Sequence, residues 1–440
     1  MSRQRSSSDA VRTLYESLPY PARDPAEEDR RLVRTSLDYL PKISHYGFAG
    51  RLHLRRPLRV LVAGGGTGDS LIFLAEQLRR TEAELVYLDL SEASTRIARE
   101  RALRRGLENI RFCVGSIDQL DPDEHGHFDF INCSGVLHHL PDPDAGLKAL
   151  GQVLADDGVI GLMVYARYGR TAVYQIQSLI DTLTDDDESL DARIEVARKA
   201  LDALAPGHWW KRSEELHTDH KRYGDAGLAD LFLNPIDQAY TVPDLYRWLE
   251  RCDMALIDYA DHRLAYDPAS YVRDPKLARR IAGLSREDQQ AAAELLSGTI
   301  SKHTVYVRSR DSDAATARPS ADMIPVPAFE LDLADLVKRF SPSATGQSRT
   351  IEKPGARLNL PVNPVSIVLF RSLDGHHDIS RIANRLVREA GSQAPEKWLR
   401  DQIDALVELL VRADLLHLVD GREVGDWLER TRPWPNPLSR

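Results

Sequence analysis

The sequence predicts an α/β fold, built on a seven-stranded and mainly parallel sheet with helical insertions, and three observations predict it. Apolar strands alternate with amphipathic helices from about residue 58 to residue 165. Those strands are apolar along their whole length, which is typical of a parallel sheet that helices cover on both faces. A glycine-rich turn joins the first strand directly to the first helix, which is the geometry of nucleoside-cofactor sites.

The strands and helices follow one another in a regular order. The predicted strands cover residues 58–62, 85–88, 110–114, 128–133, 159–165, 255–259 and 304–307. The helices between the early strands cover residues 71–78, 91–105 and 144–154. Two stretches with helical and irregular patterns, at about 169–239 and 267–297, interrupt this order, so we interpret them as insertions.

The composition divides the chain into four parts. Residues 1–50 precede the sheet, and residues 51–310 hold the sheet with its insertions. Residues 311–327 are small, polar and proline-bearing, which is typical of a linker. Residues 328–440 are expected to form a smaller α+β domain, winged-helix-like because two or three helices precede a β ribbon.

Composition also excludes several classes of protein. The 440 residues carry a net charge of -9, which disfavours nucleic acid as a partner. Three cysteines cannot form a disulfide framework, and no Cys or His spacing indicates a bound metal. No apolar run is long enough to span a membrane and the N-terminus lacks the apolar stretch of a secretory signal, so we expect a cytoplasmic protein.

Two segments at strand ends indicate where a nucleoside would bind. In Gly64-Gly65-Gly66-Thr67-Gly68, glycine allows backbone to approach a ligand closely, and Asp69 directly after the turn disfavours the pyrophosphate of a dinucleotide. A purely structural turn is the alternative. Asp89 ends the second strand, where an acid can hold two ribose hydroxyls; a solvated acid at a strand end is the simpler interpretation.

Two further segments follow the third and fourth strands. In Gly115-Ser116-Ile117-Asp118, Asp118 either accepts a hydrogen bond from an adenine amine or caps the following turn. The stretch 133–141, CSGVLHHLP, follows the fourth strand, where tight backbone would border both the cofactor and an acceptor.

Together these motifs resemble the class I S-adenosylmethionine-dependent methyltransferases. VLVAGGGTG resembles the first motif of this family, YLDLS its ribose-binding acid, GSID its adenine loop and FDFINCSGVLHHLPDP its fourth-strand segment. The resemblance implies a Rossmann-like sheet whose last strand is antiparallel, and S-adenosyl-L-methionine as the cofactor. It implies cofactor contacts from Ala63, Gly64, Gly65, Gly66, Gly68, Asp89, Leu90, Ser116, Ile117, Asp118 and Ser134.

The sequence departs from the family at one position and resembles it at another. Val62 stands where the family often has an acid, so the methionine amino group would be held by backbone carbonyls or water.

Residues 14–25, LYESLPYPARDP, resemble the cofactor-covering segment of many of these enzymes. Tyr15 and Tyr20 could close over the sulfonium, since aromatic faces attract positive charge; ordinary packing of an N-terminal arm is the alternative.

The candidates for proton transfer lie beside the cofactor segments. His138 and His139 belong to the fourth-strand loop, although HHLP also occurs in the family as a structural signature, and Tyr165 ends the fifth strand. Tyr168 and Arg170 are expected to face the acceptor. The further candidates are His217 and His220 in the first insertion.

We therefore expect a methyltransferase (EC 2.1.1) that moves a methyl group in line onto a protein or peptide side chain or onto a small-molecule acceptor. The C-terminal module slightly favours a large acceptor, and it would bind a peptide or partner protein, or serve in packing or in a homodimer. The alternative class is a methyltransferase-like regulatory protein that binds the cofactor, or nothing, without turnover.

Overall fold

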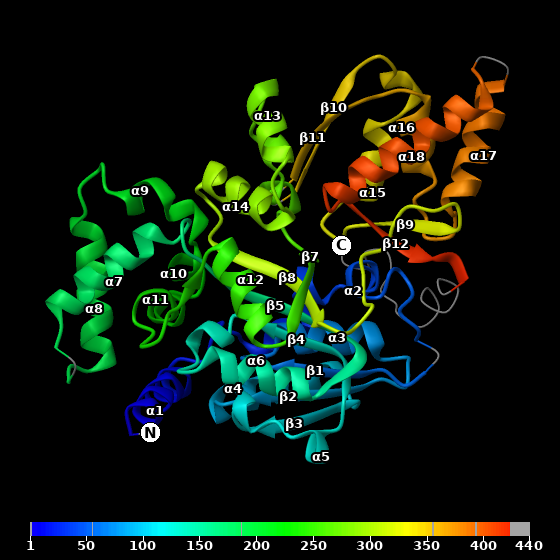
Figure 1. Ribbon diagram of the computed structural model, residues 1–440. Helices are drawn as coiled ribbons and strands as arrows, with labels where there is room; N and C mark the ends of the chain where they lie inside the picture. The colour runs from blue at the N-terminus through cyan, green and yellow to red at the C-terminus, as the bar shows by residue number, and fades with distance from the viewer. Residues whose placement is uncertain (1, 55, 186, 354–355, 392–393, 423–440) are drawn as a thin grey trace.

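A single mixed sheet forms the centre of the molecule (Figure 1). The computed structural model describes residues 2–54, 56–185, 187–353, 356–391 and 394–422. Within them the strand order is β3-β2-β1-β4-β5-β8-β7, and the short strand β6 pairs with β5. The strands of this sheet are β1 (Arg59–Ala63), β2 (Glu84–Asp89), β3 (Ile110–Val114), β4 (Phe128–Ser134), β5 (Leu154–Ala166), β6 (Ala239–Tyr240), β7 (Met254–Tyr259) and β8 (Lys302–Ser309).

The predicted direction of the strands is confirmed. The pairs β1/β2, β2/β3, β1/β4 and β4/β5 are parallel, whereas β8 is antiparallel to both β5 and β7. Because parallel strands end at the same edge, the loops after β1, β2, β4 and β5 meet there. This carboxyl edge is where the predicted site lies.

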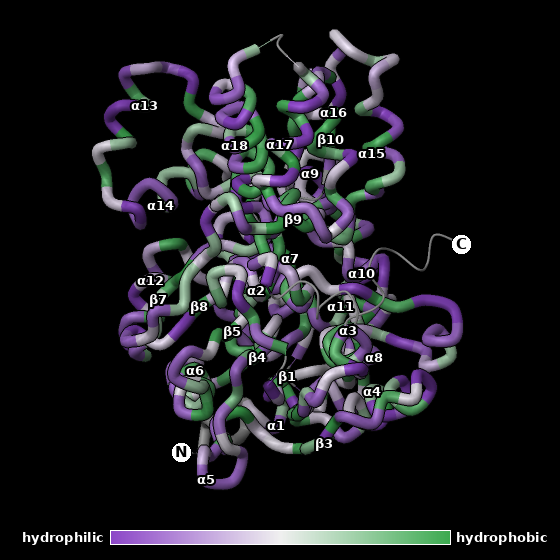
Figure 2. The backbone as a smooth tube through the Cα atoms, turned by 90° about the vertical axis from the view of Figure 1, so that its right-hand side faces the viewer, coloured by the Kyte–Doolittle hydropathy of each residue, from purple (hydrophilic) through white to green (hydrophobic). Residues whose placement is uncertain are grey.

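Helices cover both faces of the sheet, and β1 shows why. Leu61 and Ala63 point into a core shared with α6 and α12, whereas Val60 and Val62 point into a second core shared with α2, α3 and α4. Figure 2 shows the apolar stretches gathered along the central strands. The covering helices are α2 (Leu40–Gly47), α3 (Asp69–Leu78), α4 (Glu92–Arg105), α6 (Pro143–Gln152) and α12 (Val242–Arg251), with the short α5 (Pro122–His125) before β4.

The first insertion forms a helical block with its own core. Leu14 of the N-terminal helix α1 packs into that core, so residues far apart in the sequence lie together. The helices of the block stand beside the sheet in Figure 1. Helix α1 spans Ser2–Ser17, and the block contains α7 (Thr171–Leu183), α8 (Leu190–Ala203), α9 (Trp209–Ser213), α10 (Asp219–Arg222) and α11 (Gly224–Phe232).

The second insertion is a pair of helices, α13 (Pro275–Ala282) and α14 (Arg286–Ser297). Helix α14 is attached to the sheet domain because Glu294 accepts a hydrogen bond from the Val242 N–H at 2.8 Å and the Tyr246 hydroxyl donates to Gln290 at 2.8 Å. Helix α13 buries none of its residues.

The C-terminal part differs in two ways from the expectation. Strand β9 (Met323–Pro327) lies inside the stretch whose composition indicated a linker, and it pairs with β12 (Leu416–Asp420). The β ribbon, β10 (Ser348–Lys353) and β11 (Ala356–Pro361), precedes the three helices instead of following them, so the winged-helix order is wrong. The helices of this part are α15 (Leu333–Arg339), α16 (Pro364–Arg371), α17 (Ile379–Ala390) and α18 (Glu396–Arg412).

A buried ion cluster attaches this C-terminal part to the sheet domain. Lys42 of α2 contacts Asp414, which precedes β12, and Asp261, which follows β7, each at 2.8 Å. The Tyr46 hydroxyl also donates to Asp414, at 3.0 Å. Burial lowers the pKa of Lys42, but the two carboxylates outweigh it and raise that pKa, so the lysine remains charged. Among the described residues, no helix is long and apolar enough to cross a membrane.

Candidate cofactor and acceptor site

The glycine turn is drawn onto the end of β2 by backbone hydrogen bonds. The N–H groups of Gly64 and Gly65 both donate to the Leu88 carbonyl, at 2.7 and 3.2 Å. Gly64 has φ +69°, and a Cβ on it would lie 2.4 Å from Val136. The turn therefore requires glycine for both conformation and space, and it leaves open backbone at the carboxyl edge that suits a nucleoside cofactor.

Asp89 sits directly beside the turn. Its Oδ2 accepts from the Gly66 N–H at 2.7 Å, and its Oδ1 accepts from the Ser91 N–H at 2.9 Å. Burial raises the pKa of Asp89 to about 6, against these two hydrogen bonds, which lower it. Each carboxylate oxygen has a second lone pair, so Asp89 can still accept from a ribose hydroxyl. Asp89 is held by these two hydrogen bonds and is half-buried, which suits a residue that binds a ribose. Leu90, which follows it, is also half-buried.

The remaining predicted cofactor residues line the same edge. Ser116 precedes the short helix η3 (Ile117–Gln119), in which Ile117 is buried and Asp118 is exposed. Ser116, not Asp118, is the residue at the N-cap of that helix. Ser134 is the last residue of β4 and is half-buried, and Gly135 after it donates to the Met163 carbonyl at 3.0 Å.

Val62, which replaces the usual acid, packs into the core between the sheet and α3. Its neighbour across the sheet is Asn132 of β4, whose Nδ2 donates to Asp38 at 2.6 Å. Burial raises the pKa of Asp38 to about 6. The Asp38 carboxylate, from the short helix η2 (Ser36–Asp38), therefore lies beside Asn132, the sheet neighbour of Val62, and is fully buried there.

The N-terminal arm lies across the glycine turn. The Tyr20 carbonyl accepts from the Thr67 N–H at 3.3 Å, and the Pro21 carbonyl accepts from the Thr67 hydroxyl at 2.7 Å. A Cβ on Gly66 would lie 2.6 Å from the Tyr20 carbonyl oxygen. The arm therefore covers the turn, as a cofactor-covering segment would.

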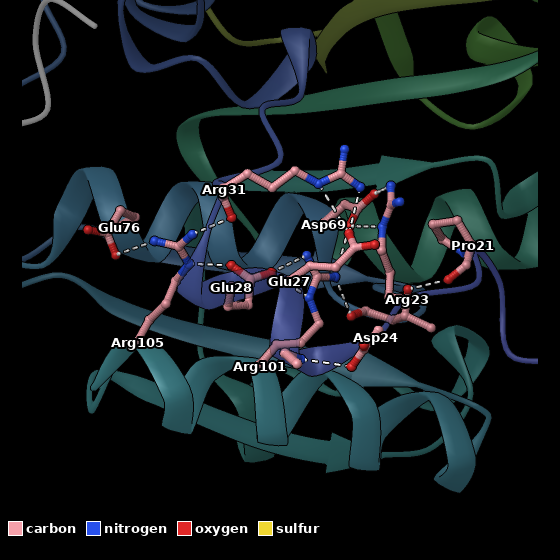
Figure 3. A network of polar contacts seen from close by, with 12 residues as sticks. Pro21, Arg23, Asp24, Glu27, Glu28, Arg31, Asp69, Glu76, Arg101 and Arg105 are labelled. Carbon is pink, nitrogen blue, oxygen red and sulfur yellow. Dashed lines mark hydrogen bonds and ion pairs between the residues drawn. The ribbon is translucent and has the colours of Figure 1, made fainter. Parts of the chain in front are cut away.

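A buried ion network that the sequence motifs did not indicate fixes this arm (Figure 3). Asp69 contacts Arg23 of the arm at 2.5 Å and Arg101 of α4 at 2.8 Å. Arg101 also contacts Glu28 of the arm at 2.7 Å, and Glu28 pairs with Arg105. Burial alone would raise the pKa of Asp69, but the two arginines lower it. Asp69 thus anchors the arm, which is a role different from repelling a pyrophosphate.

His139 and Tyr165 meet where β4 and β5 end. The His139 ring lies 5.5 Å from the Tyr165 ring, and its Nδ1 is 2.5 Å from the Ile236 carbonyl. Since a carbonyl only accepts, Nδ1 donates to Ile236, and in the neutral ring the lone pair lies on Nε2. His138 is fully buried against Tyr165, at 3.8 Å between rings, and burial lowers its pKa well below the usual range. Of the two histidines, His139 has the geometry of a base.

Other candidates from the sequence have structural partners. Arg170 stacks on Tyr165 at 3.5 Å and forms a buried ion pair with Asp237 at 2.5 Å. Tyr168 points to solvent, with 37% of its surface exposed. His217 donates from Nε2 to the Gly169 carbonyl at 2.9 Å, and His220 contacts Glu214 at 3.0 Å. Within the described chain, no three His, Cys, Asp or Glu side chains form a metal-binding group.

The first insertion places an acid and an amide beside the N-terminal helix. Asp230 accepts from the Tyr15 hydroxyl at 2.8 Å, and Asn234 donates to the same hydroxyl at 2.9 Å. Tyr20 makes an edge contact with Tyr223 at 5.5 Å. These residues come from segments more than 200 positions apart, so no local pattern in the sequence could indicate them.

Comparisons with known proteins agree with this geometry. A family described as "Methyltransferase domain" matches residues 61–160. An uncharacterized protein of Synechococcus sp. is 32% identical over 306 residues, which is 68% of this chain and 71% of that protein. The ubiquinone biosynthesis O-methyltransferase of Xanthomonas euvesicatoria is 31% identical over 109 residues, 25% of this chain and 44% of that enzyme.

A solved structure shares the fold. PKMT2 from Rickettsia typhi in complex with AdoHcy has a TM-score of 0.62 at 13% identity, and the match covers 88% of this chain and 76% of that one. The strand order, the glycine turn and the acid after β2 define a class I methyltransferase. The chain belongs to the class I S-adenosylmethionine-dependent methyltransferase family, and its cofactor is S-adenosyl-L-methionine.

Proposed function

We propose that the chain is an active methyltransferase that transfers the methyl group of S-adenosyl-L-methionine to a side chain of a protein or peptide, in preference to a small metabolite. The observation that carries the proposal is the hydrogen bond from His139 Nδ1 to Ile236, which leaves Nε2 without a partner among the described residues, at the carboxyl edge that also holds the glycine turn. A methyl-donor site and a base therefore open at one edge of one sheet.

The turn needs bare backbone, as a cofactor turn does, because a Cβ on Gly64 would clash with Val136 and one on Gly66 with the Tyr20 carbonyl. When bound, the cofactor supplies an electrophilic methyl group on a sulfonium. We infer that Asp89 binds the ribose and that the arm with Tyr20 excludes water. The further residues proposed to contact the cofactor are Ala63, Gly64, Gly65, Gly66, Gly68, Leu90, Ser116, Ile117, Asp118 and Ser134.

His139 is proposed as the general base, with Tyr165 and His138 as positioning residues. The hydrogen bond to the Ile236 carbonyl orients the ring of His139 and fixes its tautomer. Tyr165 is held between the His138 ring and the Arg170 guanidinium. A fixed base and a covered site suit an in-line displacement, which depends on positioning and exclusion of water.

Two features favour a large acceptor. The helical block of the first insertion contributes Asp230 and Asn234 beside Tyr15, and the C-terminal part is attached to α2 through the Lys42 cluster. These added elements give the chain surface beyond the sheet domain that a protein substrate can contact.

Calorimetry and a methylation assay test the proposal together. S-adenosylmethionine and S-adenosylhomocysteine should both bind the purified protein, and labelled cofactor should transfer its methyl group to the protein fraction of a cell extract. His139→Gln should lower the transfer rate about 100-fold or more, while S-adenosylhomocysteine still binds within twofold of wild type. His125→Gln, on the exposed helix α5, is the matched control.

The outcomes separate the alternatives. Binding without transfer would favour the non-catalytic regulatory class, and label in the small-molecule fraction alone would contradict a protein acceptor. Unchanged transfer in His139→Gln would remove this residue from the mechanism.

A further inference from the structure

Among the described residues, no cation pairs with Asp230, a buried carboxylate beside the N-terminal helix. Asp230 is 5% exposed. Its Oδ1 accepts from the Tyr15 hydroxyl, whose own oxygen accepts from Asn234. No described residue forms a hydrogen bond with its Oδ2. This oxygen is also not fully enclosed by the protein. A buried carboxylate normally has a partner for its charge, and none of the described residues supplies one for Asp230.

The cation Arg170 is already paired with another acid. Arg170 lies at the same face, but its guanidinium binds Asp237 at 2.5 Å, and both side chains are almost fully buried. Asp237 also accepts from Tyr174 at 3.1 Å and from Gln177 at 2.9 Å, which holds the pair in place. Arg170 therefore cannot turn to Asp230 without breaking this cluster, and the face keeps an excess of negative charge.

The Tyr15 hydroxyl bonds this acid directly, and the charge of Asp230 also acts on Tyr20 and Tyr165. For Tyr15, Tyr20 and Tyr165, burial raises the phenol pKa most and the charge of Asp230 raises it next. Burial raises the pKa of Asp230, and the hydrogen bond from Tyr15 partly offsets this. Aromatic rings beside a desolvated carboxylate suit an organic cation.

We propose that the methyl acceptor is an amine, which enters as an ammonium ion and is bound by Asp230 among Tyr15, Tyr20 and Tyr165. This inference rests on the proposed methyl transfer and names its substrate class. A carboxylate or phenolate acceptor would instead place a second anion beside Asp230 in a site with little water, which is unfavourable.

The proposed methyl transfer needs only the amine, S-adenosyl-L-methionine and His139 to account for every bond and proton. The ammonium loses one proton to Nε2 of His139, and the freed nitrogen lone pair forms the new N–C bond. The S–C bond breaks as that bond forms, and its electron pair stays on sulfur, which leaves S-adenosylhomocysteine. Asp230 accepts a hydrogen bond from the nitrogen and orients it.

Chemical blocking of amines in a cell extract tests the acceptor class. One portion of extract is treated with acetic anhydride and then with hydroxylamine, which leaves amines acetylated and restores phenols; a second portion is left untreated. Both are incubated with the full-length protein and methyl-labelled S-adenosylmethionine. We expect label in the untreated portion and its loss after acetylation.

Variants of one helix connect this result to Asp230. Asp230→Asn should lower labelling at least about tenfold, because a buried charge pair loses one partner, and Asp230→Glu should retain more activity than Asn. Asp225→Asn, an exposed acid on the same helix α11, is the matched control and should keep wild-type labelling. Calorimetry with S-adenosylhomocysteine should show affinity within twofold for all variants.

Several results would overturn the inference. Label that survives acetylation would show that the acceptor is not an amine, and wild-type labelling in Asp230→Asn would remove this acid from acceptor binding. Loss of S-adenosylhomocysteine binding in Asp230→Asn would assign the residue to the cofactor or to folding, with Asp230→Glu separating the two. Cofactor binding with no labelling in either portion would refute the proposed methyl transfer itself.

Discussion

Substituting Gly66 by alanine probes how the arm and the glycine turn form one site. The new Cβ would lie 2.6 Å from the Tyr20 carbonyl oxygen. Since ordinary contact begins at 3.4 Å, the arm would have to move by the difference, about 0.8 Å. That movement lengthens the 3.3 Å hydrogen bond from Thr67 to Tyr20 and carries the Tyr20 ring with it.

The substitution also has a backbone cost, which a second glycine isolates. Gly66 has φ +52°, and Gly298 has φ +63° with no atom within 4 Å of a new Cβ. A left-handed conformation costs an alanine about 1–2 kcal/mol, so both variants should lose that amount of unfolding free energy in urea. Only Gly66→Ala should also lose S-adenosylhomocysteine affinity, by at least about tenfold, or about 1.4 kcal/mol.

Calorimetry with S-adenosylhomocysteine, together with urea unfolding, measures both quantities on the same samples. Wild-type affinity in Gly66→Ala would refute the assignment of the turn to the cofactor. An equal loss of affinity in Gly298→Ala would show that the effect comes from general destabilisation and not from the clash with Tyr20.

Three further predictions follow from the buried charges. Arg101→Met should lower the unfolding free energy by about 3 kcal/mol, because Glu28 and Asp69 lose a buried partner. Arg104→Met breaks a more exposed pair with Asp29 and should lower it by about 1 kcal/mol or less. Equal losses in the two variants would contradict the role of the network. Asp414→Asn should lower the unfolding free energy by about 3 kcal/mol, since Lys42 loses one of its two carboxylate partners. Glu389→Ala on the surface of α17 should change it by less than about 1 kcal/mol. A small effect of Asp414→Asn would mean that the cluster does not hold the C-terminal part. In the folded protein the pKa of Asp89 is raised to about 6. Protonation of Asp89 therefore stabilises the ligand-free fold as pH falls through 6. The same protonation weakens the binding of any ligand that needs the ionised carboxylate. S-adenosylhomocysteine affinity should therefore fall as pH is lowered from 7 to 5, and Asp89→Asn should bind weakly with a flatter profile; an identical pH profile in the variant would exclude Asp89 as the titrating group.

Much of the methyl-donor site could be predicted from local patterns. Apolar runs placed the strands, and the glycine turn and Asp89 lie at the ends of neighbouring parallel strands, where topology alone brings them together. Val62 was identified as a departure, but only the fold shows that it packs into the core and that Asp38 supplies the carboxylate in its row. The network around Arg101 was missed because its members share no spacing.

The C-terminal part was harder to predict, for a related reason. Strand β9 was hidden in a stretch of linker composition, since its partner β12 lies about ninety residues further along the chain. Strand β10 has Ile351 as its one apolar residue, and Leu358 and Leu360 of β11 alternate with polar residues, so no apolar run indicates either strand. Strands of this kind are defined by the partner they pair with and not by their own periodicity.

The sequence by itself determined the class of fold and the methyl donor, because both depend on short segments whose chemistry is local: strand, glycine turn and acid. The tertiary structure decided which groups face an acceptor. His139 becomes a base through the carbonyl of Ile236, and Asp230 meets Tyr15 across 215 positions. Such contacts form only when an insertion closes over a sheet edge, so their energies come from burial and charge pairing between segments that the local sequence does not relate.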